Sequence, residues 1–279
     1  MSMKLATLKV TGIGVAYPSS LVPADELDNL AYAHFNRSPA LDKTLAINHC
    51  SGIKTLSVVA PFDSPFLNQP TAPSITEISD LFLVEGLALA TSAARSAIAE
   101  AGISADEITH VVASTCTNSS NPGYDLLLAR ELGLRPTVEK ILLHGVGCSG
   151  GLAGLRLASS LCHTAVWRER PANVLVAATE INSSLARNGL ECVDRDQEVR
   201  VGLALFADAA SALILSLEYG SGEVLDGAAA DADRKGPEKG IFEVINAIHM
   251  VVPGTESILR FDISSQGLNF LFSPSFAPC

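Results

Sequence analysis

No stretch of this 279-residue sequence is continuously apolar over the ~20 residues that a membrane-spanning helix needs. Lys4 and Lys9 interrupt the N-terminus, which therefore lacks the apolar centre of a secretory signal peptide. The composition is 48% hydrophobic and 18% charged, which excludes an intrinsically disordered chain. We therefore expect a globular, cytoplasmic protein without a membrane span.

Positive charge is also scarce, because 19 Lys and Arg stand against 30 Asp and Glu, for a net charge of −11. A nucleic-acid-binding surface needs a basic patch, so we expect no nucleic-acid partner. The six cysteines are scattered and form no C-x-x-C pair. This spacing predicts reduced thiols and no metal site.

Apolar strands alternate with helical segments through most of the chain. The patterns predict strands at 7–15, 109–115, 138–144, 173–181, 209–217, 241–252 and 258–263. They predict helices at 23–32, 38–48, 74–101, 122–132 and 150–167. The proline-rich stretch 61–73 and the stretch 219–240 are predicted to be loops. Strands separated by helices imply βαβ crossovers and a central mixed or parallel sheet, an α/β class.

Two local patterns add detail to this prediction. Ser74 and Glu77 have the spacing of a capping box at the start of the long helix, and Gly102 stands where such a helix ends. The strand at 173–181 is almost wholly apolar, which is typical of a strand covered on both faces.

Cys148 stands where the apolar strand 138–144 meets the glycine-rich stretch 145–154 and the following helix. A helix N-terminus carries partial positive charge and unpaired N–H groups, which favour a thiolate. Glycines allow a sharp turn and close approach of a substrate. Cys148 is therefore a candidate nucleophile, although a structural cysteine in a tight turn, or a Cys variant of the Gly-x-Ser-x-Gly hydrolase elbow, fits the same residues.

Five motifs occur in a fixed order, at 116–125, 132–136, 144–151, 173–181 and 202–208. In sequence and spacing they resemble the type III polyketide synthases, the chalcone/stilbene synthase family, and more closely its fungal and bacterial branch. The resemblance runs from about Val10 to about Pro274. It implies an α/β thiolase-like fold, with an N-terminal half of order βαβαβαββ around a mixed central sheet.

The resemblance implies that Cys148 is an acyl-thioester nucleophile. The family loads an acyl-CoA starter on this cysteine and extends it with malonyl-CoA by decarboxylative Claisen condensation, so the CoA thioesters are substrates and no cofactor is expected. Phe206 matches an aromatic gatekeeper between the CoA tunnel and the active-site cavity. The turn at 121–122 matches one near the family's dimer interface, so a homodimer is expected.

Further substrate-binding residues follow from the same resemblance. Cys116 matches a cavity position that sets starter size, and Glu180, Asn182 and Leu185 fall where further cavity residues are expected. Lys54 falls in the loop that binds the CoA phosphates. Residues 207–209 read Ala-Asp-Ala where the family has Gly-Asp-Gly, which is expected to stiffen or narrow this turn.

The family's catalytic His and Asn motifs have no match downstream of Phe206. His249 lies in an apolar, strand-like run at 247–253 and resembles a cavity-wall or edge-strand position. His144 is interpreted as a structural histidine. We expect residues 1–217 to form the thiolase-like N-terminal half, and 218–279 a loop and the first strands of a second half that is largely missing.

Without those donors we expect weak acyl loading on Cys148 and no complete condensation. Three explanations stay open: a truncated gene product, one part of a split enzyme, or a non-catalytic relative that binds acyl-CoA or a partner.

Overall fold

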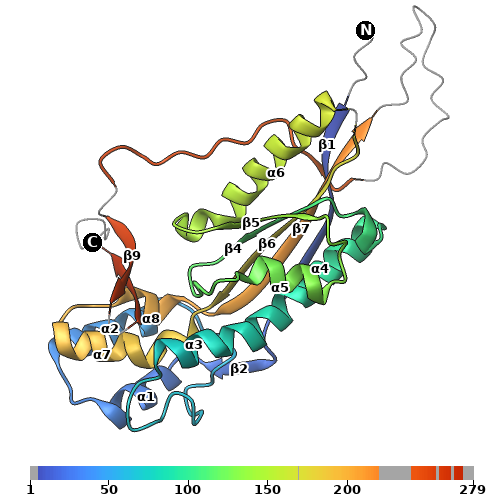
Figure 1. Cartoon of the computed structure of the whole chain (residues 1–279). Helices are drawn as coiled ribbons and strands as arrows, with labels where there is room; N and C mark the ends of the chain where they lie inside the picture. The colour runs from blue at the N-terminus through green and yellow to red at the C-terminus, as the bar shows by residue number, and fades with distance from the viewer. Residues whose placement is uncertain (1–5, 169, 220–239, 256–257, 265–266, 273–279) are drawn as a thin grey trace, which may run out of the picture.

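A mixed sheet of six strands forms the centre of the molecule (Figure 1). The computed structural model describes residues 6–168, 170–219, 240–255, 258–264 and 267–272. The strands lie in the order β5-β4-β6-β7-β1-β8. Their bounds are β1 Ala6–Ala16, β4 His110–Ser114, β5 Glu139–Leu143, β6 Asn173–Ile181, β7 Asp208–Tyr219 and β8 Phe242–Glu243. Strands β5, β4 and β6 are parallel, whereas β7 and β1 are antiparallel to their neighbours, so the predicted mixed sheet is confirmed.

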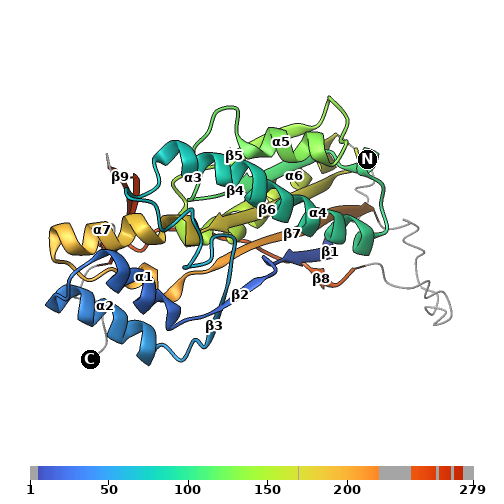
Figure 2. The same cartoon turned by 90° about the horizontal axis from the view of Figure 1, so that it is seen from below.

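Helices cover both faces of this sheet, as Figures 1 and 2 show. Helices α4 (Leu87–Ala101) and α5 (Tyr124–Glu131) pack on one face, and α6 (Gly150–Trp167) packs on the other. Side chains alternate along the strands, so Val111 and Leu175 enter the first core while Val112 and Val174 enter the second. The prediction that 173–181 is covered on both faces is therefore confirmed.

The predicted long helix is present but interrupted. Helix α3 (Ile75–Leu81) passes through a π-helical turn (Phe82–Gly86) into α4. The Ser74 hydroxyl accepts from the Glu77 amide at 3.3 Å, and the Glu77 carboxylate accepts from the Ser74 amide at 2.8 Å, which confirms the capping box. Gly102 ends α4 in the left-handed region with φ +65°.

Small residues let α4 lie unusually close to β1. A Cβ on Gly14 would meet the Ala93 carbonyl oxygen at 2.0 Å, so only glycine fits there. By length and composition alone Ile75–Ala101 could cross a membrane. Its alanines at 90, 93, 94 and 97 are fully buried against the sheet, which identifies α4 as a core helix.

A smaller layer of helices extends one end of the sheet. It contains α1 (Glu26–His34), α2 (Pro39–Cys50), α7 (Ala186–Asp196), α8 (Val201–Leu205) and the two-stranded sheet of β2 (Ser20–Pro23) and β3 (Thr55–Val58). Helices α1, α2 and α7 share a core of buried leucines. The sequence predicted α1 and α2 but missed α7, α8, β2 and β3. The loop predicted at 61–73 is confirmed.

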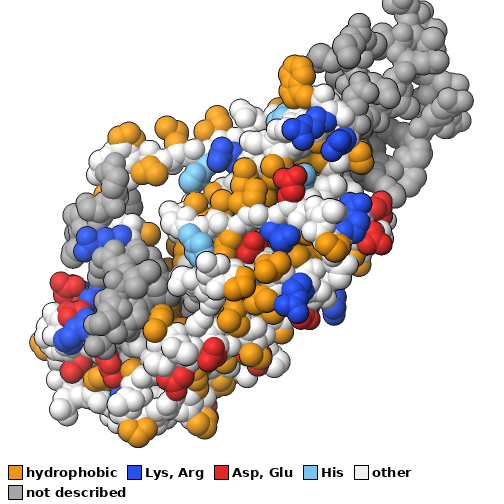
Figure 3. Space-filling view, viewed as in Figure 1, with side chains coloured by type: hydrophobic (Ala, Val, Ile, Leu, Met, Phe, Trp, Pro, Cys, Tyr) orange, Lys and Arg blue, Asp and Glu red, His pale blue; other side chains and the backbone are white. Residues whose placement is uncertain are grey.

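The strand predicted at 241–252 is wrong for most of its length. Only β8 pairs with the edge strand β1, and residues 244–255, here called the arm, run without helix or strand to the hairpin of β9 (Leu259–Ser264) and β10 (Gly267–Phe272) (Figure 1). Figure 3 shows hydrophobic side chains exposed along this arm. Alternating apolar residues predict a strand, but a strand also needs a neighbour for its backbone, and the described residues provide none. Strand 258–263 is confirmed as β9, and most of the predicted 219–240 loop lies outside the described residues.

Candidate active site around Cys148

Cys148 lies exposed on a single 3₁₀ turn, Gly147–Ser149, which leads directly into α6. The chain reaches this turn from β5 through Gly145 and Gly147, whose φ angles are +72° and +57°. Both angles lie in the left-handed region, where a side chain would be strained. The accessible thiol therefore lies directly before the N-terminus of α6, where the first N–H groups of a helix have no partner within the helix.

Helix α6 is held against the sheet by two further glycines. A Cβ on Gly150 would meet the Ser114 hydroxyl at 2.6 Å, and one on Gly154 would meet the Val176 side chain at 2.7 Å. These contacts fix the start of α6 at the carboxyl end of β4. The thiol is thus positioned by close backbone packing on a rigid sheet.

Ser149 connects the turn that carries Cys148 to the arm. Its hydroxyl donates to the Val146 carbonyl oxygen and lies 2.9 Å from Nε2 of His249. The sequence placed His249 in a strand, which is wrong, because residue 249 lies in the irregular arm. No local pattern could have found this contact, since the two residues are 100 positions apart.

Cys116 follows β4 and lies beside the turn that carries Cys148. Its amide donates to Glu180 Oε1 at 2.7 Å, while the hydroxyls of Thr117 and Thr115 donate to Glu180 Oε2 at 2.8 and 3.3 Å. Burial, followed by the negative charges of Glu180 and Cys148, raises the pKa of the Cys116 thiol to about 12. Burial also raises the pKa of Glu180, opposed by the hydrogen bonds it accepts. The two cysteines are therefore neighbours in very different surroundings.

Three of the residues predicted to bind substrate line one largely apolar pocket. Phe206, Asn182 and Leu185 meet there with Phe270 and Arg200. The rings of Phe206 and Phe270 pack edge to face, with centroids 5.0 Å apart and planes at 78°. Phe206 comes from the end of α8 and Phe270 from β10, so the hairpin closes one side of the pocket.

The other predicted residues lie outside this pocket. Cys148 and Cys116 form a separate group at the start of α6. Lys54 is exposed just before β3, and the far end of that strand, Val58, lines the pocket. Among the described residues Lys54 has no ion-pair partner, so its ammonium group is available to an anion.

Asp208 anchors the turn where the family has Gly-Asp-Gly. This buried carboxylate accepts from the Val59 amide at 2.7 Å, from the Ser183 amide at 2.8 Å and from the Ser183 hydroxyl. Burial raises its pKa. Asn182 donates to the neighbouring Ala207 carbonyl at 2.9 Å. These bonds tie the pocket residues to the end of the sheet, a role that the sequence did not reveal.

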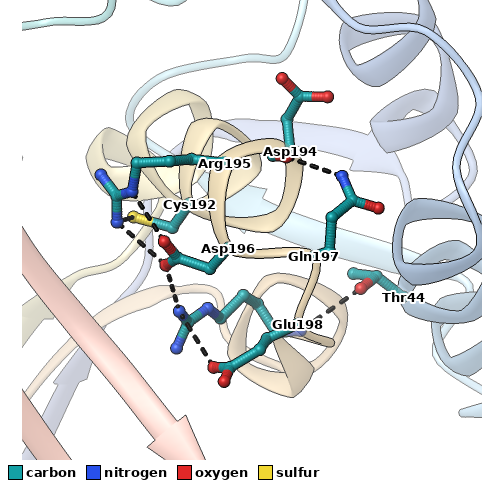
Figure 4. Close-up of polar contacts among 8 residues, drawn as sticks. Thr44, Cys192, Asp194, Arg195, Asp196, Gln197 and Glu198 are labelled. Atoms are coloured by element: carbon teal, nitrogen blue, oxygen red, sulfur yellow. Dashed lines mark hydrogen bonds and ion pairs between the residues drawn. The ribbon is translucent and has the colours of Figure 1, made fainter.

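The cationic wall of the pocket is neutralised by neighbouring carboxylates. Arg200 is buried and donates to Asp196 at 2.8 Å, with Glu198 3.5 Å away. Figure 4 shows Asp196 at the C-terminal end of α7 and Glu198 in the loop that leads to α8, with Asp196 also bound to Arg195. The backbone N–H of Arg200 donates to Thr44 of α2 at 3.3 Å. The pocket is therefore suited to a mainly apolar ligand. Within the described ranges no three His, Cys, Asp or Glu side chains cluster as a metal site would require.

Comparison with known proteins identifies the family. Residues 6–218 match the family described as chalcone and stilbene synthases, N-terminal domain. The chain is 36% identical over 261 residues to the acylalkylpyrone synthase csyB of Aspergillus oryzae, covering 94% of this chain and 63% of the relative. The chain belongs to the chalcone and stilbene synthase family.

Solved structures show the same fold. The type III pentaketide synthase from Neurospora crassa superposes with a TM-score of 0.86 at 41% identity, covering 96% of this chain and 67% of that one. The structure of CsyB complexed with CoA-SH gives a TM-score of 0.85 at 35% identity, covering 96% and 68%. The fold is the thiolase-like fold of the type III polyketide synthases, and the chain spans about two thirds of its relatives' length.

Proposed function

We propose that these residues form the acyl-loading part of a type III polyketide synthase, with Cys148 as the nucleophile. The observation that carries the proposal is an exposed thiol at the N-terminus of α6, in a chain that belongs to this family. The thiolate is the reactive form of cysteine, and a helix N-terminus carries partial positive charge and unpaired N–H groups.

The first step is a transfer between thioesters. The Cys148 sulfur attacks the carbonyl carbon of the acyl-CoA, the new C–S bond forms, and the bond to the CoA sulfur breaks, so that CoA leaves as its thiol. In the whole enzyme malonyl-CoA then loses CO₂. Its enolate carbon attacks the Cys148 thioester, which forms the C–C bond and frees the cysteine. No cofactor enters this sequence.

The apolar pocket supports a place for the acyl chain. We propose that Asn182 and Leu185 line the acyl cavity within this pocket and that Phe206, packed on Phe270, separates it from the CoA entrance. Cys116, which lies outside the pocket and beside Cys148, is proposed to line the end of the cavity at the nucleophile. Lys54, exposed and without an ion-pair partner in the described part of the chain, is proposed to bind a CoA phosphate. Its replacement by Gln should raise the acyl-CoA concentration for half-maximal loading roughly twofold to fivefold.

The relatives also support proposals about the assembly. The solved structure of CsyB contains CoA-SH, which supports CoA thioesters as ligands of this chain. We propose residues 1–217 as the thiolase-like half and 218–279 as the start of the second, a homodimeric enzyme and a cytoplasmic location. Light scattering of the purified chain at several concentrations tests the dimer.

Intact-protein mass spectrometry after incubation with a long-chain acyl-CoA tests the nucleophile. We expect one adduct of the acyl mass, mapped by peptide analysis to Cys148 and absent from Cys148→Ala. An adduct that survives in Cys148→Ala would refute the assignment. Acyl-CoA binding of equal strength in both proteins, without any adduct, would instead support a non-catalytic binding protein.

A second measurement separates loading from condensation. Radiolabelled malonyl-CoA is added to the preloaded chain, and extended products are extracted. We expect loading without sustained polyketide formation from these 279 residues, because the family's His and Asn donors have no match in the sequence. Steady production of polyketide by the chain alone would overturn that expectation.

A further inference from the structure

We infer that His249 is a positioning residue for Cys148, acting through Ser149. The inference rests on the proposed role of Cys148 as nucleophile and adds a residue on the arm to its site. The contact that carries it is the 2.9 Å approach of His249 Nε2 to the Ser149 hydroxyl, one residue beyond the cysteine.

The direction of this hydrogen bond follows from the single proton of the Ser149 hydroxyl. That proton is donated to the Val146 carbonyl oxygen. The hydroxyl oxygen can then only accept from His249, so Nε2 of the imidazole carries a proton. The resulting relay runs from His249 through Ser149 to Val146 and spans the turn that carries Cys148.

Beyond Val244, whose amide donates to the Leu8 carbonyl oxygen of β1 at 2.8 Å, the position of the arm depends on the His249 contact. Among the described residues, it is the one hydrogen bond from 245–251 to the rest of the chain. Apolar burial does not hold the arm, because Ile245, Ile248 and Met250 are 92%, 77% and 73% exposed. Polar attachment at His249 therefore fixes where the arm crosses the start of α6.

The turn needs such a restraint. Gly145 and Gly147 give it two positions of high backbone freedom, and the thiol itself is exposed. Holding Ser149 and Val146 together keeps Cys148 in a fixed position at the start of α6, next to the partial positive charge of the helix N-terminus. Because Cys148 is exposed with the arm in place, the arm does not shield the thiol, and loss of the contact should slow its chemistry.

The test is the rate at which iodoacetamide alkylates Cys148 in the full chain, resolved by peptide mapping, with exposed Cys50 as the internal reference. We expect His249→Leu to slow Cys148 roughly three- to tenfold relative to Cys50, the range set by one hydrogen bond. His249→Gln should restore the rate, since its amide donates to the same hydroxyl. Ser149→Ala should match His249→Leu, and the double variant should be no slower than Ser149→Ala.

His144→Gln is the matched control, because this exposed histidine lies four residues before Cys148 and has no hydrogen-bond partner among the described residues. It should leave the rate unchanged. The inference would be overturned if His249→Leu reacted as fast as the wild type or faster. It would also be overturned if His249→Gln failed to restore the rate, or if His144→Gln slowed Cys148 as much as His249→Leu does. Alkylation is independent of acyl transfer. A chain that forms no acyl adduct but shows the His249 effect would therefore refute the proposed function and leave this inference standing.

Discussion

The turn around Cys148 and the carboxylates of Glu180 and Asp208 are built in opposite ways. The turn is glycine-rich and exposed, and its thiol faces solvent. The carboxylates are desolvated, and each is surrounded by backbone and hydroxyl donors. Burial raises the pKa of both acids, whereas the Cys148 thiol is exposed. An accessible thiol thus lies close to backbone that is held in place by buried hydrogen bonds.

The largest expected difference lies between the two neighbouring thiols. Cys116, with its pKa raised to about 12, should be alkylated at pH 8 roughly a thousand times more slowly than a thiol with an ordinary pKa of about 8.5. Peptide mapping after iodoacetamide treatment from pH 6 to pH 10 measures both cysteines in one sample. Comparable labelling of Cys116 and Cys148 at pH 8 would contradict the contrast between the two regions.

The next largest effect is expected at Asp208. All the donors around its carboxylate are oriented toward an acceptor, so Asp208→Asn places an amide N–H against another donor. We expect the free energy of unfolding to fall by about 3 kcal/mol, measured by urea denaturation. Asp208→Glu is the control that keeps the charge. A variant with wild-type stability would show that this anchor is dispensable.

The same variant tests the pH dependence of folding. The folded-state pKa of Asp208 is raised, so its stabilising contribution is complete below the unfolded-chain pKa of ~4 and is lost as the pH rises through the folded-state pKa. The wild type minus Asp208→Asn difference in unfolding free energy should therefore shrink from pH 4 upward. A difference that grows with pH would contradict a folded-state pKa of Asp208 above its unfolded-chain value.

Two adjacent glycines test the packing of the turn. Gly150→Ala places a Cβ 2.6 Å from the Ser114 hydroxyl and should cost about 2 kcal/mol of stability, while also slowing Cys148 alkylation. Gly151→Ala meets no atom within 4 Å and should stabilise α6 by about 0.5–1 kcal/mol. Thermal and urea unfolding compare them. Equal effects of the two substitutions would show that α6 does not pack closely against Ser114 of β4.

The smallest loss of stability is expected for Glu180→Gln. Two of the groups around Glu180 are threonine hydroxyls, which can rotate to accept from an amide, so we expect a loss of about 1 kcal/mol. Removing the charge should also lower the pKa of the Cys116 thiol, which Glu180 raises. The shift is read from the alkylation profile of Cys116, and a profile that stays in place would remove Glu180 as a cause.

The sequence predicts the sheet and its covering helices because apolar residues in each buried strand or helix recur with the period of that element. The strand at 173–181 and the helix at 150–167 have the predicted bounds. The pattern fails in α7, where buried Arg187 and Asn188 break the apolar periodicity. It also fails in the arm, where alternation is present without a partner strand in the described residues.

For the site, the glycine-flanked turn around Cys148 was predictable because its constraint is local. The grouping of Phe206, Asn182 and Leu185 on one pocket followed from the family resemblance. The anchoring roles of Glu180 and Asp208, and the contact of His249, depend on residues far apart in sequence. Local patterns carry no information about such contacts.

The π-helical turn between α3 and α4 has a consequence for the whole N-terminal region. Each added residue turns a helix by ~100°, so the extra residue of a π turn resets which side chains point in which direction. Before the turn, Ser79 faces the loop after β4, 2.7 Å from Ser120. After it, the alanine face of α4 meets β1. The continuous helical segment α3–α4 therefore contacts the loop after β4 at one end and β1 at the other. In a regular α-helix over the same residues, one of these two sets of side chains would point in a different direction.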